Sequence, residues 1–192
     1  VHPYVSRGGV KLAHALRTFE IDPAGRICLD LGASTGGFTD VLLRTGAAKV
    51  YAVDVGRGQL HHAIAADPRV VSLEATHAKD LSRALIPDPV EVLVCDVSFI
   101  SLKTALPPAM ALAAPKARLV TLIKPQFEVG RSRIGKGGIV KPGYGDSHGV
   151  AEDISAWIAA QDGWKSLGYT DSPILGGDGN REFLIGAVRA SS

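Results

Sequence analysis

Short apolar runs rich in Val, Ile and Leu alternate with segments of helical periodicity along most of the chain. Each run is almost continuously apolar, which is typical of a strand whose two faces are both covered by helices. Strands that alternate with helices in this way form βαβ units and a parallel sheet. The pattern therefore predicts an α/β fold. The five runs span residues 26–31, 49–55, 69–75, 90–97 and 117–124.

The remaining elements complete a sheet of seven strands. We expect a Rossmann-like, mostly parallel sheet with an antiparallel last strand and helices on both faces. Asp80 or Ser101 is placed to lie near a helix N-terminus. The expected helices span residues 6–19, 37–46, 57–66, 77–86, 101–114 and 148–162, and the two further strands span 164–174 and 182–190.

Length and composition fit one soluble globular domain. The chain has 192 residues, of which 46% are hydrophobic and 21% charged, so a single domain over 1–192 can bury a sizeable core. Cys28 and Cys95 both lie in apolar runs, which excludes a disulfide framework. Neither a membrane-spanning apolar stretch nor a signal peptide is visible, so we expect a cytoplasmic protein. The chain begins at Val1, which suggests a processed product or a fragment.

The loop after the first predicted strand is rich in glycine and lies where open α/β sheets bind ligands. A dinucleotide fingerprint requires G-x-G-x-x-G, and counting from Gly32 the second glycine position is occupied by Ser34. A nicotinamide dinucleotide is therefore disfavoured. Asp54 ends the second predicted strand, where a carboxylate can accept hydrogen bonds from both hydroxyls of a nucleoside ribose. A tight turn without a ligand is the alternative.

Three ionisable residues interrupt the apolar pattern at the ends of predicted strands. Asp96 ends the fourth run, Lys124 ends the fifth, and Glu182 opens the last strand. If that strand is antiparallel, all three lie at the carboxyl edge of the sheet. Lys11, in the leading helix, can close over the same edge. Each of them alone is equally compatible with a solvated residue at the rim of a sheet.

Six motifs, in order along the chain, resemble the TlyA-type branch of the FtsJ-like RNA 2′-O-methyltransferases, which is sometimes labelled hemolysin A. They are YVSRGGVKL, LDLGASTGGFTDVLL, YAVDVGRGQL, CDVSFISL, LIKPQFEVG and GNREFL. The resemblance covers nearly the whole chain. It implies a class I methyltransferase fold with S-adenosylmethionine as the cofactor. It also implies methyl transfer to a ribose 2′-hydroxyl, with a cytidine of ribosomal RNA as the target.

Families of this kind carry a Lys-Asp-Lys-Glu tetrad, which by position falls on Lys11, Asp96, Lys124 and Glu182. A ribose hydroxyl is a weak nucleophile, so it must be aligned with the methyl group and must lose its proton. The resemblance implies that Lys124 acts at the hydroxyl as a base or charged donor, oriented by Asp96. Lys11 would position the ribose or a phosphate, and Glu182 would hold both lysines. This reaction needs no metal ion, and the sequence offers no cluster of metal ligands.

The same resemblance implies a donor site on the glycine-rich loop and at neighbouring strand ends. Ser98 and Phe99 also match the family motif, although Phe99 is equally compatible with a place in the core. The implied donor-binding residues are Asp30, Gly32, Ala33, Ser34, Gly36, Gly37, Phe38, Asp54 and Asp96.

Charge is unevenly distributed along the chain. The net charge is only +2, but residues 116–145 hold seven Lys or Arg against one acidic residue, a local charge of +6. Such a basic stretch is typical of contacts with RNA phosphates, or of a solvated loop. Residues 130–145 contain six glycines, so we expect a loop without a packed element that orders when RNA binds. The expected RNA-binding residues are Arg7, Lys11, Arg131, Arg133, Lys136 and Lys141.

Members of the family usually carry an S4-like RNA-binding domain before the YVSRGG segment, and this chain begins without it. We expect the chain alone to bind the methyl donor and to methylate RNA weakly. Three alternatives are weaker. A base methyltransferase is disfavoured because the sequence has no D/N-P-P-Y segment. A membrane-active cytolysin is disfavoured because the sequence has no basic amphipathic segment of the interfacial type. The intact tetrad argues against a non-catalytic RNA-binding module.

Overall fold

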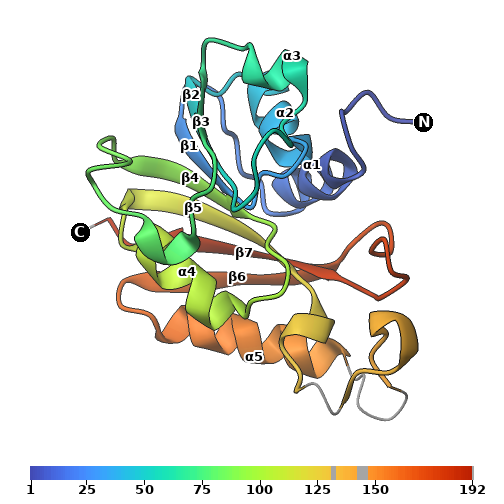
Figure 1. Cartoon of the computed structure of the whole chain (residues 1–192). Coiled ribbons are helices and arrows are strands. Elements are labelled where there is room, and N and C mark those ends of the chain that lie inside the picture. Colours follow the sequence, from blue (N-terminus) through green and yellow to red (C-terminus); the bar gives the residue numbers. More distant parts are fainter. Residues whose placement is uncertain (131–132, 142–146, 192) are drawn as a thin grey trace.

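The computed structural model describes residues 1–130, 133–141 and 147–191 (Figure 1). Its centre is one sheet of seven strands in the order β3-β2-β1-β4-β5-β7-β6. Strands β1 to β5 run parallel to one another, and β7 is antiparallel to both β5 and β6. The predicted α/β fold and the antiparallel last strand are confirmed. The strands are β1 Ile27–Leu31, β2 Lys49–Val53, β3 Val70–Leu73, β4 Val90–Cys95, β5 Ala113–Ile123, β6 Trp164–Asp171 and β7 Phe183–Arg189.

Helices cover both faces of the sheet. One face packs against α1, α2 and α3, and the other packs against α4 and α5, so each face has its own apolar cluster. Strands buried on both sides explain why the apolar runs are continuous. The helices are α1 Gly8–Thr18, α2 Gly37–Arg44, α3 His62–Ala65, α4 Leu102–Met110 and α5 Ser147–Ala160, with 3₁₀ turns η1 Ala78–Asp80, η2 Pro125–Phe127 and η4 Lys136–Gly138.

Two of the expected crossover helices are wrong in extent. The expected helix over 57–66 is reduced to the four residues of α3, because Gly58 takes a φ of 66° and His61 caps a helix that begins only at His62. The expected helix over 77–86 is reduced to η1. Its apolar anchors Leu81 and Ile86 are both buried, yet a spacing of five residues puts them on different sides of a helix.

Strand order places the site. Strands β2 and β3 lie on one side of β1, and β4 and β5 lie on the other. The direction in which successive strands are added therefore reverses at β1. Ligands of open α/β sheets bind beyond the carboxyl ends of the strands at such a point. Because β7 is antiparallel to β5, its first residues reach the same edge. This edge therefore gathers the ends of β1, β2, β4 and β5 together with the start of β7.

The glycine-rich segment after η2 contains more structure than expected. Residues 133–141, which we call the basic hairpin, fold back on themselves through an antiparallel bridge between Ile134 and Val140. The Lys141 N–H donates to the Arg133 carbonyl at 2.8 Å, and Gly137 and Gly138 turn the chain with φ of 73° and 79°. The expectation that 130–145 lacks a packed element is therefore wrong for this part.

Candidate active site

Four of the charged residues predicted for the site form two ion pairs. The Lys124 Nζ lies 2.7 Å from Asp96 Oδ1 and donates a hydrogen bond of 3.0 Å to Ser98 Oγ. The Lys11 Nζ lies 2.6 Å from Glu182 Oε1. Sequence analysis had noted Ser98 only as part of a motif. The structure gives it a contact with the ammonium of Lys124.

Sheet register puts the two pairs side by side. The last bonded pair of β5 and β7 is Ile123 with Phe183, so one further step sets Lys124 opposite Glu182. Opposed residues of antiparallel strands have Cα atoms about 5 Å apart. Lys11 reaches this point from α1, which packs on the same strands: Leu12 shares a buried cluster with Leu184.

The two pairs differ in their access to solvent. Lys11 and Glu182 are 8% and 3% exposed, so each needs the other's charge to be tolerated inside the protein. The side chains of Lys124 and Asp96 are 16% and 25% exposed. A substrate can therefore reach the outer pair, whereas the inner pair forms the wall behind it.

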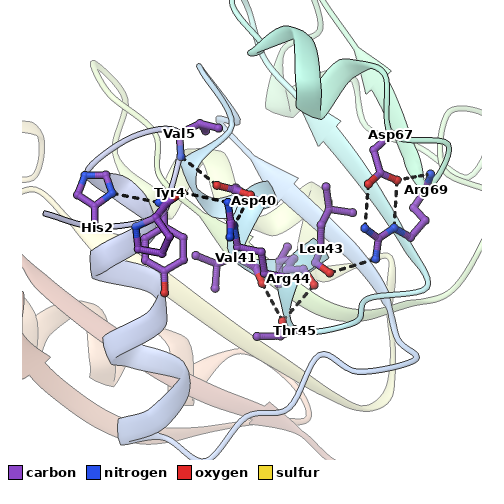
Figure 2. Close-up of polar contacts among 12 residues, drawn as sticks. His2, Tyr4, Val5, Asp40, Val41, Leu43, Arg44, Thr45, Asp67 and Arg69 are labelled. Atoms are coloured by element: carbon purple, nitrogen blue, oxygen red, sulfur yellow. Dashed lines mark hydrogen bonds and ion pairs between the residues drawn. The ribbon is translucent and has the colours of Figure 1, made fainter.

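The N-terminal segment fixes α1, and therefore Lys11, on α2 (Figure 2). The buried carboxylate of Asp40 accepts a 2.9 Å bond from the Val5 N–H and a second from Arg44, as Figure 2 shows. Arg44 also donates to the Pro3 carbonyl at 3.0 Å. The Tyr4 ring packs so closely on α1 that a Cβ at Gly9 would overlap it. The YVSRGG motif is therefore the anchor of the helix that carries Lys11.

The glycines of the loop after β1 are required by the protein's own backbone. A Cβ at Gly32 would overlap the carbonyl oxygen of Asp96, and one at Gly36 would lie 2.9 Å from Leu60. A Cβ at Gly37 would overlap the Ser6 hydroxyl. Gly32 and Gly36 also take φ of 85° and 102°. Close packing of β4, α3 and α1 around the loop explains these residues before any ligand is considered.

Asp30 is a buried acid without a cationic partner among the hydrogen bonds and ion pairs described. Its Oδ2 accepts a 2.7 Å bond from Thr39, whereas its buried Oδ1 has no hydrogen-bond partner in the part of the chain that the structure describes. The pKa of Asp30 is raised to about 7, mainly by burial and in part by the charges of Asp96 and Asp54. Three carboxyl groups therefore gather beyond β1, β2 and β4, a setting that suits a cationic ligand.

Asp54 is already occupied by backbone donors. It accepts bonds from the N–H groups of Ser34 at 3.3 Å and Gly56 at 3.0 Å. The cavity between these residues and Leu60 has a volume of only about 10 Å³, which is room for one water. The carboxylates fit a methyl donor that carries a sulfonium and an ammonium. The space directly beside Asp54 is smaller than a nucleoside in this structure.

An aromatic pair stands at the mouth of a larger cleft beside Lys124. Phe99 is 90% exposed, so the alternative that placed it in the core is wrong. Its φ of 65° is strained for a residue with a side chain, and its ring lies 5.0 Å from that of Phe127. The cleft has a volume of about 700 Å³ and is also lined by Gln126 and the basic hairpin. Exposure of this kind could not be predicted from the motif alone.

Glu128 holds this aromatic pair in place. Its carboxylate accepts bonds from the Ser101 hydroxyl at 2.7 Å and from the Leu102 N–H at 2.8 Å, which ties the segment after β5 to the start of α4. Burial raises the pKa of Glu128 above its usual value. Ser101 also caps α4 through the Lys103 N–H, as the sequence predicted.

The basic residues fall into two groups in space. Lys116 and Arg118 lie in the first half of β5, several residues before Lys124, and so sit away from the site. Arg7 is exposed and donates a 2.8 Å bond to the Leu175 carbonyl at the site edge. The predicted residues Arg133, Lys136 and Lys141 are exposed on the basic hairpin, and Arg131 lies outside the described residues.

Two further features bear on the class of protein. Across residues 1–130, 133–141 and 147–191, no group of three His, Cys, Asp or Glu side chains lies close enough to hold a metal ion. Within the same part of the chain, no helix is both long and apolar enough to cross a membrane. Cys28 and Cys95 are free, buried thiols, and burial raises the pKa of each to about 12.

Comparison with known proteins identifies the family. Residues 4–189 match the FtsJ-like methyltransferase family. The chain belongs to this family. It is 48% identical over 184 residues to a Mycobacterium tuberculosis protein named 16S/23S rRNA (cytidine-2'-O)-methyltransferase TlyA, with 95% of this chain and 67% of the relative covered. It is 46% identical to Hemolysin A of Brachyspira hyodysenteriae over 94% of this chain and 75% of that protein.

Solved structures agree with this assignment to the FtsJ-like methyltransferases. A protein from Streptococcus thermophilus named as a hemolysin has a TM-score of 0.90 and 41% identity, over 100% of this chain and 69% of the other. More distant methyltransferases, such as an O-methyltransferase from Bacillus cereus with a TM-score of 0.64 and 15% identity over 98% of this chain and 82% of the other, share the fold. The expected Rossmann-like class I methyltransferase fold is therefore confirmed.

Proposed function

We propose that this chain transfers the methyl group of S-adenosylmethionine to a ribose 2′-hydroxyl of ribosomal RNA, with a cytidine as the target. The observation that carries this proposal is the pairing of Lys124 with Asp96 directly beside the pair of Lys11 with Glu182. Support comes from the 48% identical relative, whose name states this activity. The same arrangement of four paired residues favours an enzyme over a non-catalytic RNA-binding module.

Lys124 is the residue that acts at the hydroxyl. Its ammonium is held by Asp96 and Ser98 and is partly exposed, so it can approach a ribose oxygen. Once it has given up its proton it accepts the hydroxyl proton, and while charged it stabilises the developing negative charge on that oxygen. The buried Lys11–Glu182 pair lies next to Lys124 in the register of β5 and β7 and forms the wall behind it. Because Lys11 is buried, we assign it to this wall rather than to an exposed phosphate contact.

The donor site lies along the loop after β1. S-adenosylmethionine supplies a methyl group already activated by the positive sulfur, which is why the chain needs no metal ion for this step. Asp54 would hold the ribose hydroxyls of the donor, and Asp96 its ammonium. Asp30 contributes negative charge behind them. The remaining residues assigned to this site are Gly32, Ala33, Ser34, Gly36, Gly37 and Phe38.

RNA would approach across the aromatic pair and the exposed basic residues. The Phe99 ring offers an exposed face on which a base can stack beside Lys124. Arg7, Arg133 and Lys136 are exposed on either side of the site edge, where phosphates would pass. Lys141 belongs to the same proposed surface, and Arg131, outside the described residues, stays a predicted RNA contact. Ribosomal subunits and naked ribosomal RNA are both candidate substrates, and their location makes the cytoplasm the proposed site of action.

The decisive experiment is methyl transfer from labelled S-adenosylmethionine to unmodified ribosomal RNA, with the modified nucleoside identified by mass. We expect 2′-O-methylcytidine. The Lys124→Ala variant should lose at least about 100-fold in kcat, because it removes the group that takes the proton. Lys103→Ala is the matched control, since it also removes a lysine that forms an ion pair, with Asp153 at 2.7 Å, but on the exposed surface.

Three outcomes separate the parts of the proposal. A methylated base, or full activity in Lys124→Ala, would overturn the mechanism. Calorimetry with S-adenosylmethionine tests the assignment of the cofactor independently of RNA. An absence of binding would overturn that assignment. Activity on intact ribosomal subunits but not on naked ribosomal RNA would identify the subunit as the substrate.

A further inference from the structure

The loop between β6 and β7, residues 172–182, joins segments that are far apart in the sequence. Its Leu175 carbonyl accepts from Arg7 of the N-terminal segment at 2.8 Å. Its Asp178 carboxylate accepts from Gln126, two residues after Lys124, at 3.0 Å. Its last residue, Glu182, binds Lys11. The loop is therefore in direct contact with both ends of the proposed catalytic arrangement.

Asn180 connects this loop to the basic hairpin. Its side chain is 5% exposed. The Nδ2 donates a 2.8 Å bond to the Gly138 carbonyl, and the Oδ1 accepts a 3.1 Å bond from the Val140 N–H. A backbone carbonyl only accepts and a backbone N–H only donates, so this pair of bonds fixes the orientation of the carboxamide. One side chain thus holds two backbone groups of the hairpin at once.

Asn180 is itself held firmly. Its N–H donates a 3.0 Å bond to the Asp178 carboxylate, and its carbonyl accepts a 2.9 Å bond from the Gly176 N–H. A Cβ at Gly176 would overlap the carboxylate of Glu182, so this turn rests directly on the buried ion pair. A fixed path of contacts therefore leads from Lys11 and Glu182 through the turn to the hairpin.

The hairpin is too small to hold its position alone. It has a single bridge, between Ile134 and Val140, and it contains three glycines. Isolated two-stranded hairpins are marginally stable in water, so neighbouring contacts must set its place. Arg133, Lys136 and Lys141 all lie on it and are exposed.

We propose that Asn180 is a positioning residue for RNA, which clamps the basic hairpin beside the Lys11–Glu182 pair so that its cations meet the phosphates flanking the target nucleotide. The proposal rests on the proposed function, because it presumes an RNA substrate. Asn180 touches neither RNA nor donor. It acts through Gly138 and Val140.

The test compares Asn180→Ala with wild type, using an unmodified ribosomal RNA transcript as the probe. The variant should raise the KM for RNA by about tenfold, the loss expected for one or two phosphate contacts. The KM for S-adenosylmethionine and the kcat at saturating RNA should stay within about twofold, since the tetrad is unchanged. The slope of log Kd against log salt should become shallower by about 1 to 2.

Gln161→Ala is the matched control. It also removes a carboxamide that bonds a backbone carbonyl, at 2.8 Å to Trp157, but at the end of α5 away from the site. It should leave every RNA parameter unchanged. Asn180→Asp keeps an acceptor for Val140, but it sets a carboxylate oxygen against the Gly138 carbonyl and adds a negative charge beside the hairpin, so it should raise the KM for RNA at least as much as Asn180→Ala.

A double-mutant cycle separates positioning from a purely structural role. In an Arg133→Ala, Lys136→Ala, Lys141→Ala background, Asn180→Ala should raise the KM for RNA less than twofold, because the cations it positions are gone. An undiminished effect in that background would overturn the proposal, as would an unchanged KM in a folded Asn180→Ala. Failure of both Asn180 variants to fold would assign the residue to stability alone.

Direct binding keeps this test independent of catalysis. The Kd for the transcript, measured by anisotropy of a labelled RNA, should follow the same pattern as the KM. If wild type binds RNA but transfers no methyl group, the proposed function fails and the clamp is still tested by the Kd series. If wild type binds no RNA even at low salt, both fail.

Discussion

At the scale of single residues, the chemistry depends on side chains whose neighbours come from distant parts of the chain. The strand-end positions of Asp96, Lys124 and Glu182 could be predicted, because charged residues interrupt otherwise apolar runs. The partners were implied only by the family resemblance, which pairs Lys124 with Asp96 and places Glu182 against both lysines; the ion pair that the structure gives Glu182 is with Lys11. No local pattern indicates that Lys11 binds Glu182, since that contact depends on where α1 packs. The exposure of Phe99 depends likewise on a strained backbone that the motif does not reveal.

Asp30 allows a prediction about pH at this scale. Its pKa is raised to about 7 in the folded protein, mainly by burial, and an unfolded Asp titrates near 4. Between these values the folded state holds a proton that the unfolded state has released. Stability should therefore fall as pH rises from about 4 to about 7, by on the order of 4 kcal/mol, and should level off above.

Asp30→Asn should remove this pH dependence. The amide can still accept a bond from Thr39 and cannot ionise, so the variant should match wild type at about pH 4 and below and exceed its stability at pH 8. Urea unfolding at several pH values measures both. A variant that keeps the full wild-type slope would show that Asp30 is not the group responsible. Thr39→Val should extend the fall in stability to higher pH, because the Thr39 bond lowers the pKa of Asp30 in the folded protein.

At the scale of elements, the sequence indicated the kinds of element more reliably than their lengths. Long apolar runs became strands near their expected limits, because burial on both faces leaves little choice. The segments over 57–66 and 77–86 did not become full helices, since glycine at Gly58 and the anchors Leu81 and Ile86 impose other paths. The basic hairpin was missed because its order comes from Asn180, some forty residues later.

The contact between the N-terminal segment and α2 gives a prediction about stability. Asp40→Ala removes the acceptor of the Val5 N–H and the partner of Arg44, both shown in Figure 2. Losing a buried carboxylate with two bonds should cost about 2 to 4 kcal/mol in the free energy of unfolding. Arg44→Ala should cost less, about 1 kcal/mol, because that side chain is 50% exposed. Equal costs in urea unfolding would contradict the anchoring role of Asp40.

At the scale of the whole molecule, the first helix and the last strand are packed together. Phe19, just after α1, lies against Gly186 of β7 so closely that a Cβ there would meet its ring at 2.5 Å. The sequence pattern predicted both α1 and β7, but it did not indicate that they are in contact. A glycine inside an apolar strand is compatible with several packings.

Gly186→Ala should destabilise the protein by about 1 to 3 kcal/mol, because the new methyl group has no space beside Phe19. Phe19→Ala should cost less in the Gly186→Ala background than in wild type, since it removes the ring atoms that the new methyl group would meet. The coupling energy from denaturant unfolding measures the contact directly. Additive effects of the two substitutions would show that residue 186 and the side chain of Phe19 are not in close contact.

The place of β7 between β5 and β6 has a consequence for the order of folding. β6 precedes β7 in the chain but bonds to the sheet only through it, so β6 cannot dock until the last strand has been inserted. Lys11 and Glu182 are 171 residues apart in the sequence, and contacts of such long sequence separation slow folding. The Lys11–Glu182 pair therefore cannot form until β7 has been made, and completion of the catalytic arrangement coincides with completion of the sheet.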